Sequence, residues 1–563
     1  MRSKTKNLIV LSTVAIFLVG CEGGDVKISP VTTDNSQDNS ETTTNIDQGT
    51  EVVENPCAFY VKSGQTFEGD FDGRDCSYSS IFVDSGNPLT EDLLIPALPG
   101  DGVHQFTGSL VVGEKGTMEE LAAAGITEGG DGPTVSIEAG VTMTWPSPQK
   151  FVSITRGSQI IAVGEANAPI TFTSFTDVAT QRGEDDLAFD AVGEWGGMLI
   201  NGFGITNKCA HSSGSFDGDD LVLASSCDVD TEGLAGNDET PHGGDNNNDS
   251  SGRLEYVVVK HTGAQIGEGN EINGITFGAV GRNTIVRNIQ TYSTLDDGIE
   301  LFGGALNIEN FVSVFARDDS IDLDAGWRGT INNALVIHNE NLGNGCIESD
   351  GIASYSSQSD ERINTVISQG INTRPVINNL TCIVSGQDSN TGDRGEGVGI
   401  RFREGIWPTL NDSMVVMAFS ADDADTNNYC VRFGGDEEVD GLLSGDASFN
   451  SVIFACVDKT KGGPIGADSL EDFLEGSGSQ FVDGVVSEDD PTATSNTSLV
   501  LLEGTPPIYS VAIDSMVIND AAPAVPAPAS GRVGALSTAI DDWTAGWTYG
   551  IHEGSRGAPL WFE

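Results

Sequence analysis

Positive charge is scarce in this chain. Its 563 residues include 27 lysines and arginines against 84 aspartates and glutamates, which gives a formal net charge of −57 at pH 7. Such a charge repels nucleic-acid phosphates, so we expect no nucleic-acid partner. Cations and cationic surfaces are the partners that this charge attracts, and solvation in salty water is the other explanation for it.

Catalytic signatures are also scarce. The chain has six histidines and contains neither a GxSxG motif nor a P-loop, which removes support for serine-hydrolase and phosphate-binding chemistry. None of the nine cysteines lies in a CxxC spacing, so the sequence indicates no zinc site and no redox motif of that kind.

Long hydrophobic runs are represented by one stretch, Leu8–Val19, which follows three basic residues and is too short to span a bilayer comfortably. It predicts a secretory signal peptide over residues 1–20. The run ends in Leu18-Val19-Gly20-Cys21, which resembles the lipobox of bacterial lipoproteins. The resemblance implies lipidation of Cys21, palmitate included, and sorting to the outer membrane with the protein facing the cell exterior.

Eight cysteines remain after Cys21, and they fall in pairs that are close in sequence. An oxidising compartment favours disulfides within such pairs. The predicted disulfides join Cys57 with Cys76, Cys209 with Cys227, Cys346 with Cys382, and Cys430 with Cys456.

Composition divides the rest of the chain. Residues 21–55 are polar and predict a disordered tether. We expect an N-terminal cap at residues 56–105 and repeated coils at residues 106–460. A polar insertion loop at about residues 208–252 interrupts the coils. Residues 461–563 form the C-terminal loop and helix segment and cap.

A sequence repeat runs through residues 252–338. Leu295–Leu301 recurs as Arg317–Leu323, and Asn288 recurs as Asn310, both after 22 residues (319 minus 297 for the second aspartate of each segment). Apolar and polar residues alternate within the repeat, which is typical of half-buried strands. A fixed period of this kind predicts stacked coils, so the expected fold is all-β, a right-handed parallel β-helix.

Asparagines recur just before the apolar strands. Stacked amides can bond one coil to the next, so we expect a structural ladder. The predicted column comprises Asn288, Asn310, Asn333, Asn379, Asn411 and Asn450.

Aspartates recur at the turn that precedes each strand. Stacking would place these carboxylates about 4.8 Å apart, where two full charges repel by about 3 to 4 kcal/mol at an effective dielectric near 20. Asx-turn hydrogen bonds, protonation or a bound calcium ion could relieve this repulsion. The predicted metal ligands are Asp296, Asp297, Asp318, Asp319 and Asp350, and calcium is the candidate cofactor.

Outward side chains form a second column. Alternation places Glu300 and Phe302 outward, and the matching pairs of later coils are Asp322 with Asp324, Ala353 with Tyr355, Arg401 with Arg403, and Arg432 with Gly434. Such a face could neutralise itself, or it could bind an extended ligand through aromatic platforms and arginine forks. The predicted ligand-binding residues are Glu300, Phe302, Asp322, Asp324, Trp327, Tyr355, Arg401, Arg403, Trp407 and Arg432. Equally spaced coils suit a repeating polymer, so an extracellular polysaccharide is the expected partner.

Several segments together resemble a family of bacterial surface β-helix lipoproteins and secreted proteins. They include Glu271–Phe277, Gly397–Gly405 and the closing segment Asp541–Thr548, which reads DDWTAGWT. The resemblance implies the β-helix fold and a surface location. It supplies no catalytic residues.

Two other functions stay open. A polysaccharide lyase or glycoside hydrolase would need a base and carboxylates, for which Lys260, Asp297, Asp319 and Arg401 are the candidates. An accessory lipoprotein of an outer-membrane receptor could use Trp543 and Trp547 to dock its partner. We expect binding of an extended glycan, with calcium, rather than catalysis.

Overall fold

The computed structural model describes residues 55–563 apart from residues 235, 237–239, 268–269, 386–397, 419–428, 457, 483–500 and 514–530. The expected signal peptide, the lipidation site Cys21 and the tether up to residue 54 lie outside the described residues.

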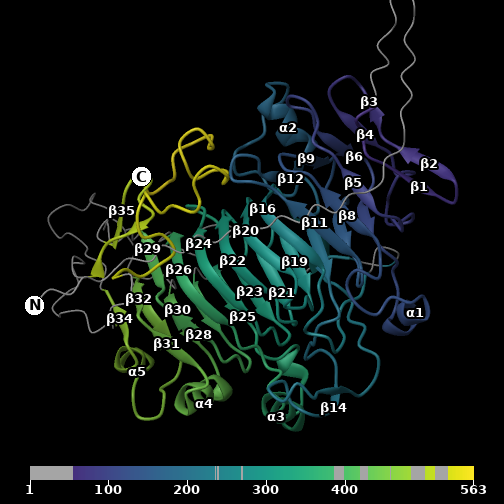
Figure 1. Cartoon of the computed structure of the whole chain (residues 1–563). Coiled ribbons are helices and arrows are strands. Elements are labelled where there is room, and N and C mark those ends of the chain that lie inside the picture. The colour runs from purple at the N-terminus through teal and green to yellow at the C-terminus, as the bar shows by residue number, and fades with distance from the viewer. Residues whose placement is uncertain are drawn as a thin grey trace, which may run out of the picture. The chain divides into compact units, whose positions relative to one another are not determined.

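Two parallel sheets wind through the described chain and form a parallel β-helix, as the repeat predicts (Figure 1). The ten-stranded sheet contains β7 (Leu110–Val112), β10 (Val152–Ile154), β13 (Met198–Asn201), β19 (Ile275–Gly278), β21 (Ile299–Phe302), β23 (Ile321–Asp324), β25 (Gly345–Ser349), β27 (Val398–Phe402), β30 (Tyr429–Phe433) and β33 (Asp458–Lys461). Each strand pairs in parallel with the strand of the next coil.

The 18-stranded sheet supplies the remaining strands of the coils. Its strands are β3 (Asp70–Phe71), β4 (Cys76–Tyr78), β5 (Leu93–Ile95), β6 (His104–Phe106), β8 (Thr134–Ile137), β9 (Thr142–Trp145), β11 (Gln159–Val163), β12 (Ile170–Ser174), β16 (Gly252–Lys260), β20 (Ile285–Tyr292), β22 (Asn307–Val314), β24 (Thr330–Ile337), β26 (Val376–Ser385), β28 (Thr409–Asn411), β29 (Met414–Ala418), β31 (Ser448–Asn450), β32 (Val452–Ala455) and β34 (Ser479–Phe481). Stacked strands therefore begin within the segment expected to form the N-terminal cap.

Short helices and hairpins lie between the coil strands. The helices are α1 (Met118–Ala123), α2 (Phe175–Gln181), α3 (Asp360–Ser368), α4 (Asp436–Ser444) and α5 (Leu470–Gly476), with a 3₁₀ turn, η2, at Tyr355–Ser357. The hairpins are β1 (Phe59–Lys62) with β2 (Gln65–Glu68), β14 (His211–Ser213) with β15 (Val222–Leu223), β17 (Ala264–Gly267) with β18 (Asn270–Ile272), and β35 (Leu502–Glu503) with β36 (Tyr509–Ser510).

The long strands of the 18-stranded sheet bend at a residue in the left-handed backbone region. In β20, β22, β24 and β26 that residue is asparagine, with φ values of 51°, 60°, 60° and 56°. Asparagine tolerates this conformation better than most residues. The bend lets one continuous strand cover two sides of a coil.

The asparagine ladder is confirmed at Asn288, Asn310, Asn333 and Asn379, whose amides bond one to the next over 2.8, 2.8 and 3.0 Å. The prediction is wrong for Asn411 and Asn450. They lie one position earlier in the coil and belong to a second ladder of amide hydrogen bonds. This ladder runs through Asn332, Asn378, Asn411 and Asn450. Asp412 and Ser451 occupy the left-handed positions of those coils, with φ values of 49° and 56°.

The interior of the coils is apolar, with Ile299, Leu301, Ile321 and Leu323 among its fully buried residues. All four predicted disulfides are confirmed: Cys57 with Cys76, Cys209 with Cys227, Cys346 with Cys382, and Cys430 with Cys456. The last two lie in the coil interior, where one joins β25 to β26 and the other joins β30 to the residue directly after β32.

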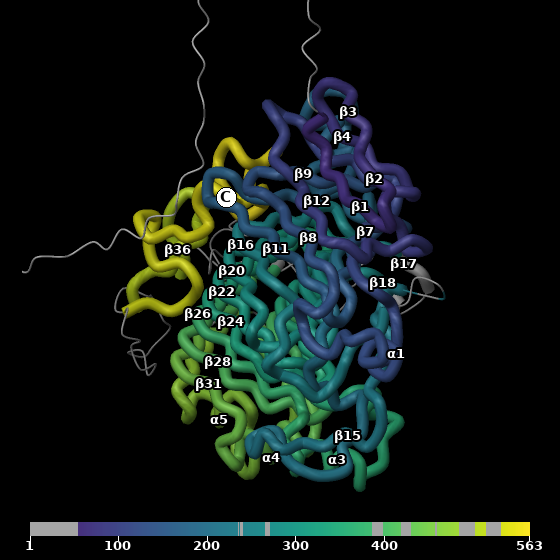
Figure 2. The backbone as a smooth tube through the Cα atoms, turned by 45° about the vertical axis from the view of Figure 1, so that its right-hand side comes forward, coloured from purple at the N-terminus to yellow at the C-terminus, as the bar shows by residue number. Residues whose placement is uncertain are grey.

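The C-terminal segment lies beside the coils (Figure 2). Its apolar residues, Trp547 and Ile551 among them, pack on the outer surface of the 18-stranded sheet against Val312 and Leu335. Tyr549 exchanges two hydrogen bonds of 2.7 Å with the side chain of Gln290. This segment therefore covers the side of several coils. From the sequence, we expect it to form a cap.

Candidate functional site: an acid-to-base column on the ten-stranded sheet

The outward side chains of the ten-stranded sheet change from acidic to basic along the stack. Strand register aligns one residue per coil in this column, in the order Thr276, Glu300, Asp322, Glu348, Arg401, Arg432 and Lys461. A neighbouring column, two residues later in each strand, holds Phe302, Asp324, Asp350 and Arg403. We refer to the first set as the charge column.

The register corrects two of the predicted alignments. Ile347 pairs with Ile321, so Glu348 and Asp350 take the places that had been assigned to Ala353 and Tyr355. The predicted stack of Asp297, Asp319 and Asp350 is therefore wrong at Asp350. The residue above Asp319 is a glycine, Gly345, whose carbonyl accepts a hydrogen bond from Ser320 N over 3.0 Å.

Only glycine fits at position 345, because a side chain there would collide with Asp319. A Cβ atom there would lie 2.3 Å from an Asp319 carboxylate oxygen, which is closer than any real Cβ contact. The misalignment arose because Ser349-Asp350-Gly351-Ile352 resembles the turn motif of earlier coils, although it follows β25 instead of preceding it.

Six carboxylates gather where β21 and β23 begin. This acid cluster comprises Asp296, Asp297, Glu300, Asp318, Asp319 and Asp322. Asp297, Glu300 and Asp319 are buried, with exposed fractions of 7%, 6% and 3%. The stacking of Asp297 and Asp319 is as predicted, because Asp319 N donates to Asp297 Oδ1 over 2.9 Å.

One amide ties the cluster to the preceding coil. Asn273 donates from Nδ2 to Glu300 Oε2 over 2.6 Å, and its Oδ1 accepts from Asp297 N over 3.2 Å. Asn273 is itself fully buried, so it fixes the Glu300 carboxylate and the backbone of Asp297 from the preceding coil.

Proton affinity is raised throughout the acid cluster. Burial first, and then the charge of Asp318, raises the pKa of Asp296 to about 8. Burial and neighbouring carboxylates also raise the pKa of Asp297, Glu300, Asp319 and Asp322 well above the usual range. In the absence of a bound cation, these carboxyl groups therefore keep their protons at pH values where exposed carboxyl groups are ionised.

The acid cluster contains two sets of carboxylate oxygens, and each set could hold one cation. Asp296, Asp297 and Asp318 offer atoms within 4.8 Å of one another, and so do Asp297, Glu300 and Asp322. Asp322 Oδ1 is buried and has no hydrogen-bond partner among the described residues. Oxygen-only donors suit calcium, so these residues fit such an ion. The predicted ligands Asp319 and Asp350 belong to neither set.

Arginines neutralise the next part of the face. Glu348 pairs with Arg401 over 2.8 Å and with Arg403 over 2.6 Å, and Arg403 reaches Asp350 over 2.5 Å. The side chain of Arg403 remains 39% exposed, so part of it still faces solvent. Arg432 and Lys461 extend the charge column in the following coils.

The predicted aromatic platforms are not on the surface. Trp327 is fully buried and Phe302 is 2% exposed, so neither ring can contact a ligand. The ammonium of Lys208 lies 4.3 Å from the ring centroid of Phe302, and the ring of His242 stacks with that of Phe302 at a centroid distance of 6.0 Å. Both covering residues come from the insertion, which sequence alternation alone could not place.

The other two aromatic candidates are half-buried. Tyr355 lies in η2 and packs with apolar residues around α3. Trp407 donates to the carbonyl of Glu437 over 2.8 Å and stacks under Arg374 at 4.2 Å. Their contacts are therefore mainly within the protein.

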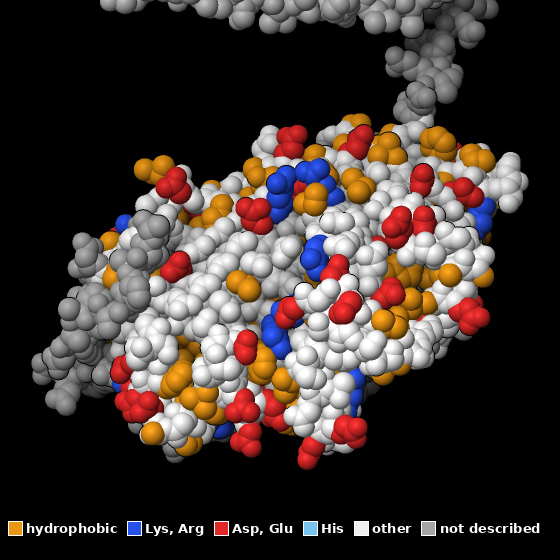
Figure 3. Space-filling view, turned by 60° about the horizontal axis from the view of Figure 1, so that its bottom comes forward, with side chains coloured by type: hydrophobic (Ala, Val, Ile, Leu, Met, Phe, Trp, Pro, Cys, Tyr) orange, Lys and Arg blue, Asp and Glu red, His pale blue; other side chains and the backbone are white. Residues whose placement is uncertain are grey.

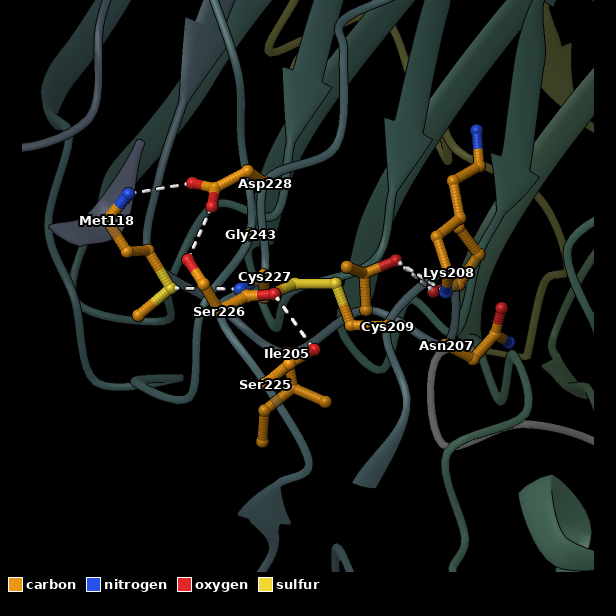
Figure 4. Close-up of a disulfide and its surroundings, with 12 residues drawn as sticks. Met118, Ile205, Asn207, Lys208, Cys209, Ser225, Ser226, Cys227, Asp228 and Gly243 are labelled. Atoms are coloured by element: carbon orange, nitrogen blue, oxygen red, sulfur yellow. Dashed lines mark hydrogen bonds between the residues drawn. A yellow bond between two sulfur atoms is a disulfide. The ribbon is translucent and has the colours of Figure 1, made fainter. Parts of the chain in front are cut away.

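The insertion forms the wall of the site beside the acidic coils. Lys208 lies 3.9 Å from Asp324 and is followed directly by Cys209, whose disulfide with Cys227 is drawn in Figure 4. Arg156 is fully buried and holds this part of the insertion, because it donates to the carbonyls of Cys227 and Gly243 over 2.9 and 2.8 Å and pairs with Asp228 over 2.6 Å.

The candidate base Lys260 lies on a different sheet. It ends β16, is 2% exposed, and pairs with Asp177 over 2.7 Å beneath the ring of Tyr549. Its expected role beside Asp297, Asp319 and Arg401 is therefore wrong, because the C-terminal segment covers it.

Three residues of the site were missed by sequence reasoning: Lys208, Asn273 and Glu348. Glu348 could have been found by aligning Ile347 with Ile321 at an offset of 26 residues (347 minus 321) instead of extending the turn motif. Lys208 and Asn273 carry no comparable signal, because loops outside the repeat place them.

Residues 109–480 match the family model described as a pectate-lyase-like β-helix domain. Comparisons with curated proteins and with solved structures gave no match. Within the described part of the chain, every helix is too short or too polar to cross a membrane.

Proposed function

Because the chain belongs to the pectate-lyase-like β-helix family, we propose that it binds an extended anionic glycan along the charge column, with calcium held by the acid cluster. The observation that carries this proposal is the order of charges, from Glu300 and Asp322 through Glu348 to Arg401 and Arg432, at one residue per coil. A polymer with regularly spaced anionic groups matches a surface with this regular spacing.

The acid cluster supports the calcium part of the proposal. Its carboxylates lie too close together to be fully ionised without a cation, and the free Asp322 Oδ1 offers an unused donor. Calcium there would balance the charge and leave coordination positions for ligand oxygens, since it takes six to eight oxygens. Either Asp296, Asp297 and Asp318 or Asp297, Glu300 and Asp322 would hold it.

The arginines support the choice of an anionic ligand. Guanidinium groups bind carboxylate or sulfate through two parallel hydrogen bonds. Acidic side chains are spread over the face drawn in Figure 3 and basic ones occur in a few small groups. A glycan that carries uronate or sulfate groups would therefore be guided to the arginines and to calcium in the acid cluster, and repelled by the other acidic side chains.

A panel of polysaccharides measured with calcium and with a chelator tests the proposal. We expect polyuronates or sulfated glycans to bind in calcium and to lose at least tenfold in affinity in chelator, while neutral glycans do not bind. Equal binding with and without chelator would contradict the calcium site. Binding of neutral glycans alone would contradict the role of the charge column.

Two variants test the residues. Asp322→Asn should weaken calcium binding, and Arg403→Gln should weaken glycan binding while leaving calcium binding unchanged. Glu119→Gln and Arg74→Gln change exposed charges away from the column and serve as matched controls.

Cleavage of the glycan is the second candidate function. The family is described as pectate-lyase-like, and Arg401 and Arg403 lie beside carboxylates as a proton-abstracting site would require. Prolonged incubation with a bound polyuronate, followed by the ultraviolet absorbance of unsaturated products and a reducing-end assay, distinguishes a lyase or hydrolase from a binding protein.

We also propose that the protein is anchored to the outer membrane through lipid on Cys21 and faces outward. The lipobox-like segment and the four disulfides support an exported protein. Incorporation of labelled palmitate that is lost in Cys21→Ser would support the anchor. Co-purification of a receptor in a detergent extract would support the accessory-lipoprotein alternative.

A further inference from the structure

A buried group of reactive side chains lies outside the charge column, beneath the C-terminal segment. Asp177 of α2, Lys260 at the end of β16, and His261 have exposed fractions of 4%, 2% and 1%. Lys260 Nζ lies 2.7 Å from Asp177 Oδ2, and His261 Nε2 lies 3.6 Å from Asp177 Oδ1. None of the functions proposed above uses these three residues.

We propose that Lys260 and Asp177 form an intramolecular amide bond, with His261 carrying the protons. The arrangement contains a nucleophile, an electrophilic carboxyl group and a proton carrier in contact, and the surrounding protein excludes water. Excluding water favours amide formation, because water is the product that must leave and the reagent that would reverse the reaction.

The two oxygens of Asp177 have different surroundings, which assigns their roles. Oδ2 accepts hydrogen bonds from Thr173 Oγ1 over 2.6 Å and from Gln181 Nε2 over 3.0 Å. These donors would stabilise the negative charge that develops on this oxygen during attack. Oδ1 faces His261 and is the oxygen that leaves.

The backbone fixes the orientation of His261. Its Nδ1 lies 2.7 Å from the carbonyl oxygen of Ala191, which can only accept, so Nδ1 carries the proton and Nε2 is left to exchange protons with Asp177. Burial lowers the pKa of Lys260, which favours the neutral amine, although Asp177 opposes this effect. Asp177 itself has a lowered pKa, because His261 and Lys260 together outweigh burial.

The reaction balances within this group. One proton passes from the Lys260 ammonium through the carboxylate to His261 Nε2, which leaves a neutral amine. Nζ then attacks Cγ of Asp177 and forms the N–C bond. Oδ1 takes the proton from His261 and one from the amine, the C–O bond breaks, and one water leaves. Oδ2 becomes the amide oxygen and keeps the hydrogen bonds from Thr173 and Gln181.

The bond would join α2 permanently to the coil that contains β16. It would also remove two opposite charges from the interior, where an ion pair is costly to bury. The ring of Tyr549, 4.0 Å from Lys260 Nζ, closes the group from the C-terminal side.

Tryptic digestion of the purified full-length protein, after reduction and alkylation, tests the proposal. An amide on Lys260 blocks cleavage there and joins residues 157–182 to residues 254–282, with a mass lower than their sum by one water. Recovery of residues 254–260 and 261–282 as free peptides in full yield would overturn it. Lys150 and Asp84, a more exposed pair at 3.3 Å, should remain unlinked in the same digest.

Variants separate the proton carrier from the structure. Lys260→Arg should abolish the linked peptide, and His261→Gln should fold, as judged by circular dichroism, with at least a tenfold lower linked fraction. Full linkage in His261→Gln would contradict the role of His261. Because the wild-type digest alone decides whether the bond exists, the test does not depend on these variants folding.

Discussion

At the scale of single residues, each asparagine of the first ladder both bends its strand and bonds to the neighbouring coils. Asn310 adopts a left-handed backbone conformation with φ of 60° and bonds to the amides of Asn288 and Asn333 over 2.8 Å each. Each amide has both a donor and an acceptor, so a row of them can bond without interruption. The bend of the coil and the bond between coils therefore depend on the same residue.

Substitution of Asn310 by alanine should be costly. It removes two part-buried hydrogen bonds and places alanine in the left-handed region, so we expect a loss of about 2 to 4 kcal/mol in unfolding free energy. Denaturant or thermal unfolding measures this loss. Asn450→Ala, at the exposed end of the second ladder, should cost about 0.5 kcal/mol or less. Equal losses in the two variants would contradict the account.

A second residue-scale prediction concerns Glu438 of α4. Its carboxylate is fully buried and accepts hydrogen bonds from Gly405 N and from Gly435 N, the latter over 2.8 Å. Burial raises its pKa to about 7 from an ordinary 4.5. The folded protein thus binds this proton more tightly than the unfolded chain, so the stability from Glu438 falls as pH rises from 4.5 to 7 and is constant above that.

This loss amounts to about 3 to 4 kcal/mol at most, because the pKa rises from 4.5 to about 7. Glu438→Gln removes the titration, so the Tm of the variant should depend less on pH than the wild-type Tm between pH 5 and 7. Asp440→Asn, an exposed change on the same helix, is the control and should follow the wild type. Parallel curves for wild type and Glu438→Gln would refute the assignment.

At the scale of elements, the insertion between β13 and β16 decides which outward side chains are accessible. It covers Phe302 with Lys208 and His242, and it depends on the buried Arg156 for its position. The coils supply the charges of the site, and the insertion determines where the exposed part of the charge column begins.

Replacement of Arg156 by methionine should loosen this element selectively. The change removes the guanidinium that pairs with Asp228 and donates to the carbonyls of Cys227 and Gly243, and losses of this type are about 3 to 5 kcal/mol. Hydrogen exchange should rise in peptides of the insertion and stay unchanged in β20 and β22. Arg74→Met, at an exposed ion pair, is the control. Uniform exchange across all coils would contradict a local role.

Sequence reasoning succeeded for elements that repeat and failed for those that do not. The 22-residue offset gave the stacking of Asp297 on Asp319 and the ladder from Asn288, because identical coils repeat the same geometry. It failed after β24, where a longer connection shifts Asp350 onto the level of Asp324. Alternation separates the inside from the outside of a coil, but it does not indicate that a loop covers Phe302 or a distant segment covers Lys260.

At the scale of the whole molecule, the C-terminal segment forms a seam with the 18-stranded sheet. Trp547 is 3% exposed, donates to the carbonyl of Trp543 over 2.7 Å and contacts the ring of Tyr256 edge-on. The outer surface of that sheet is apolar, with Val312, Leu335 and Ile383 fully buried by the seam. An uncovered surface of this kind would favour aggregation.

Trp547→Ala should therefore destabilise the protein by about 3 to 5 kcal/mol and increase dye binding to exposed apolar surface. Ile540→Ala changes a residue of the same segment that is 94% exposed, so its stability should match the wild type within about 0.5 kcal/mol. Thermal unfolding with a hydrophobic dye measures both. A harmless Trp547→Ala would mean that the seam contributes little.

Strand register along the charge column fixes the distances between its charged side chains. Glu300 and Arg401 are three coils apart through Asp322 and Glu348, a separation of about 14 Å at 4.8 Å per coil. Duplicating or deleting one coil would change that separation by a single step and leave both ends intact. Ligands of a different repeat length could thus be matched by gene duplication of a coil, with no redesign of either end.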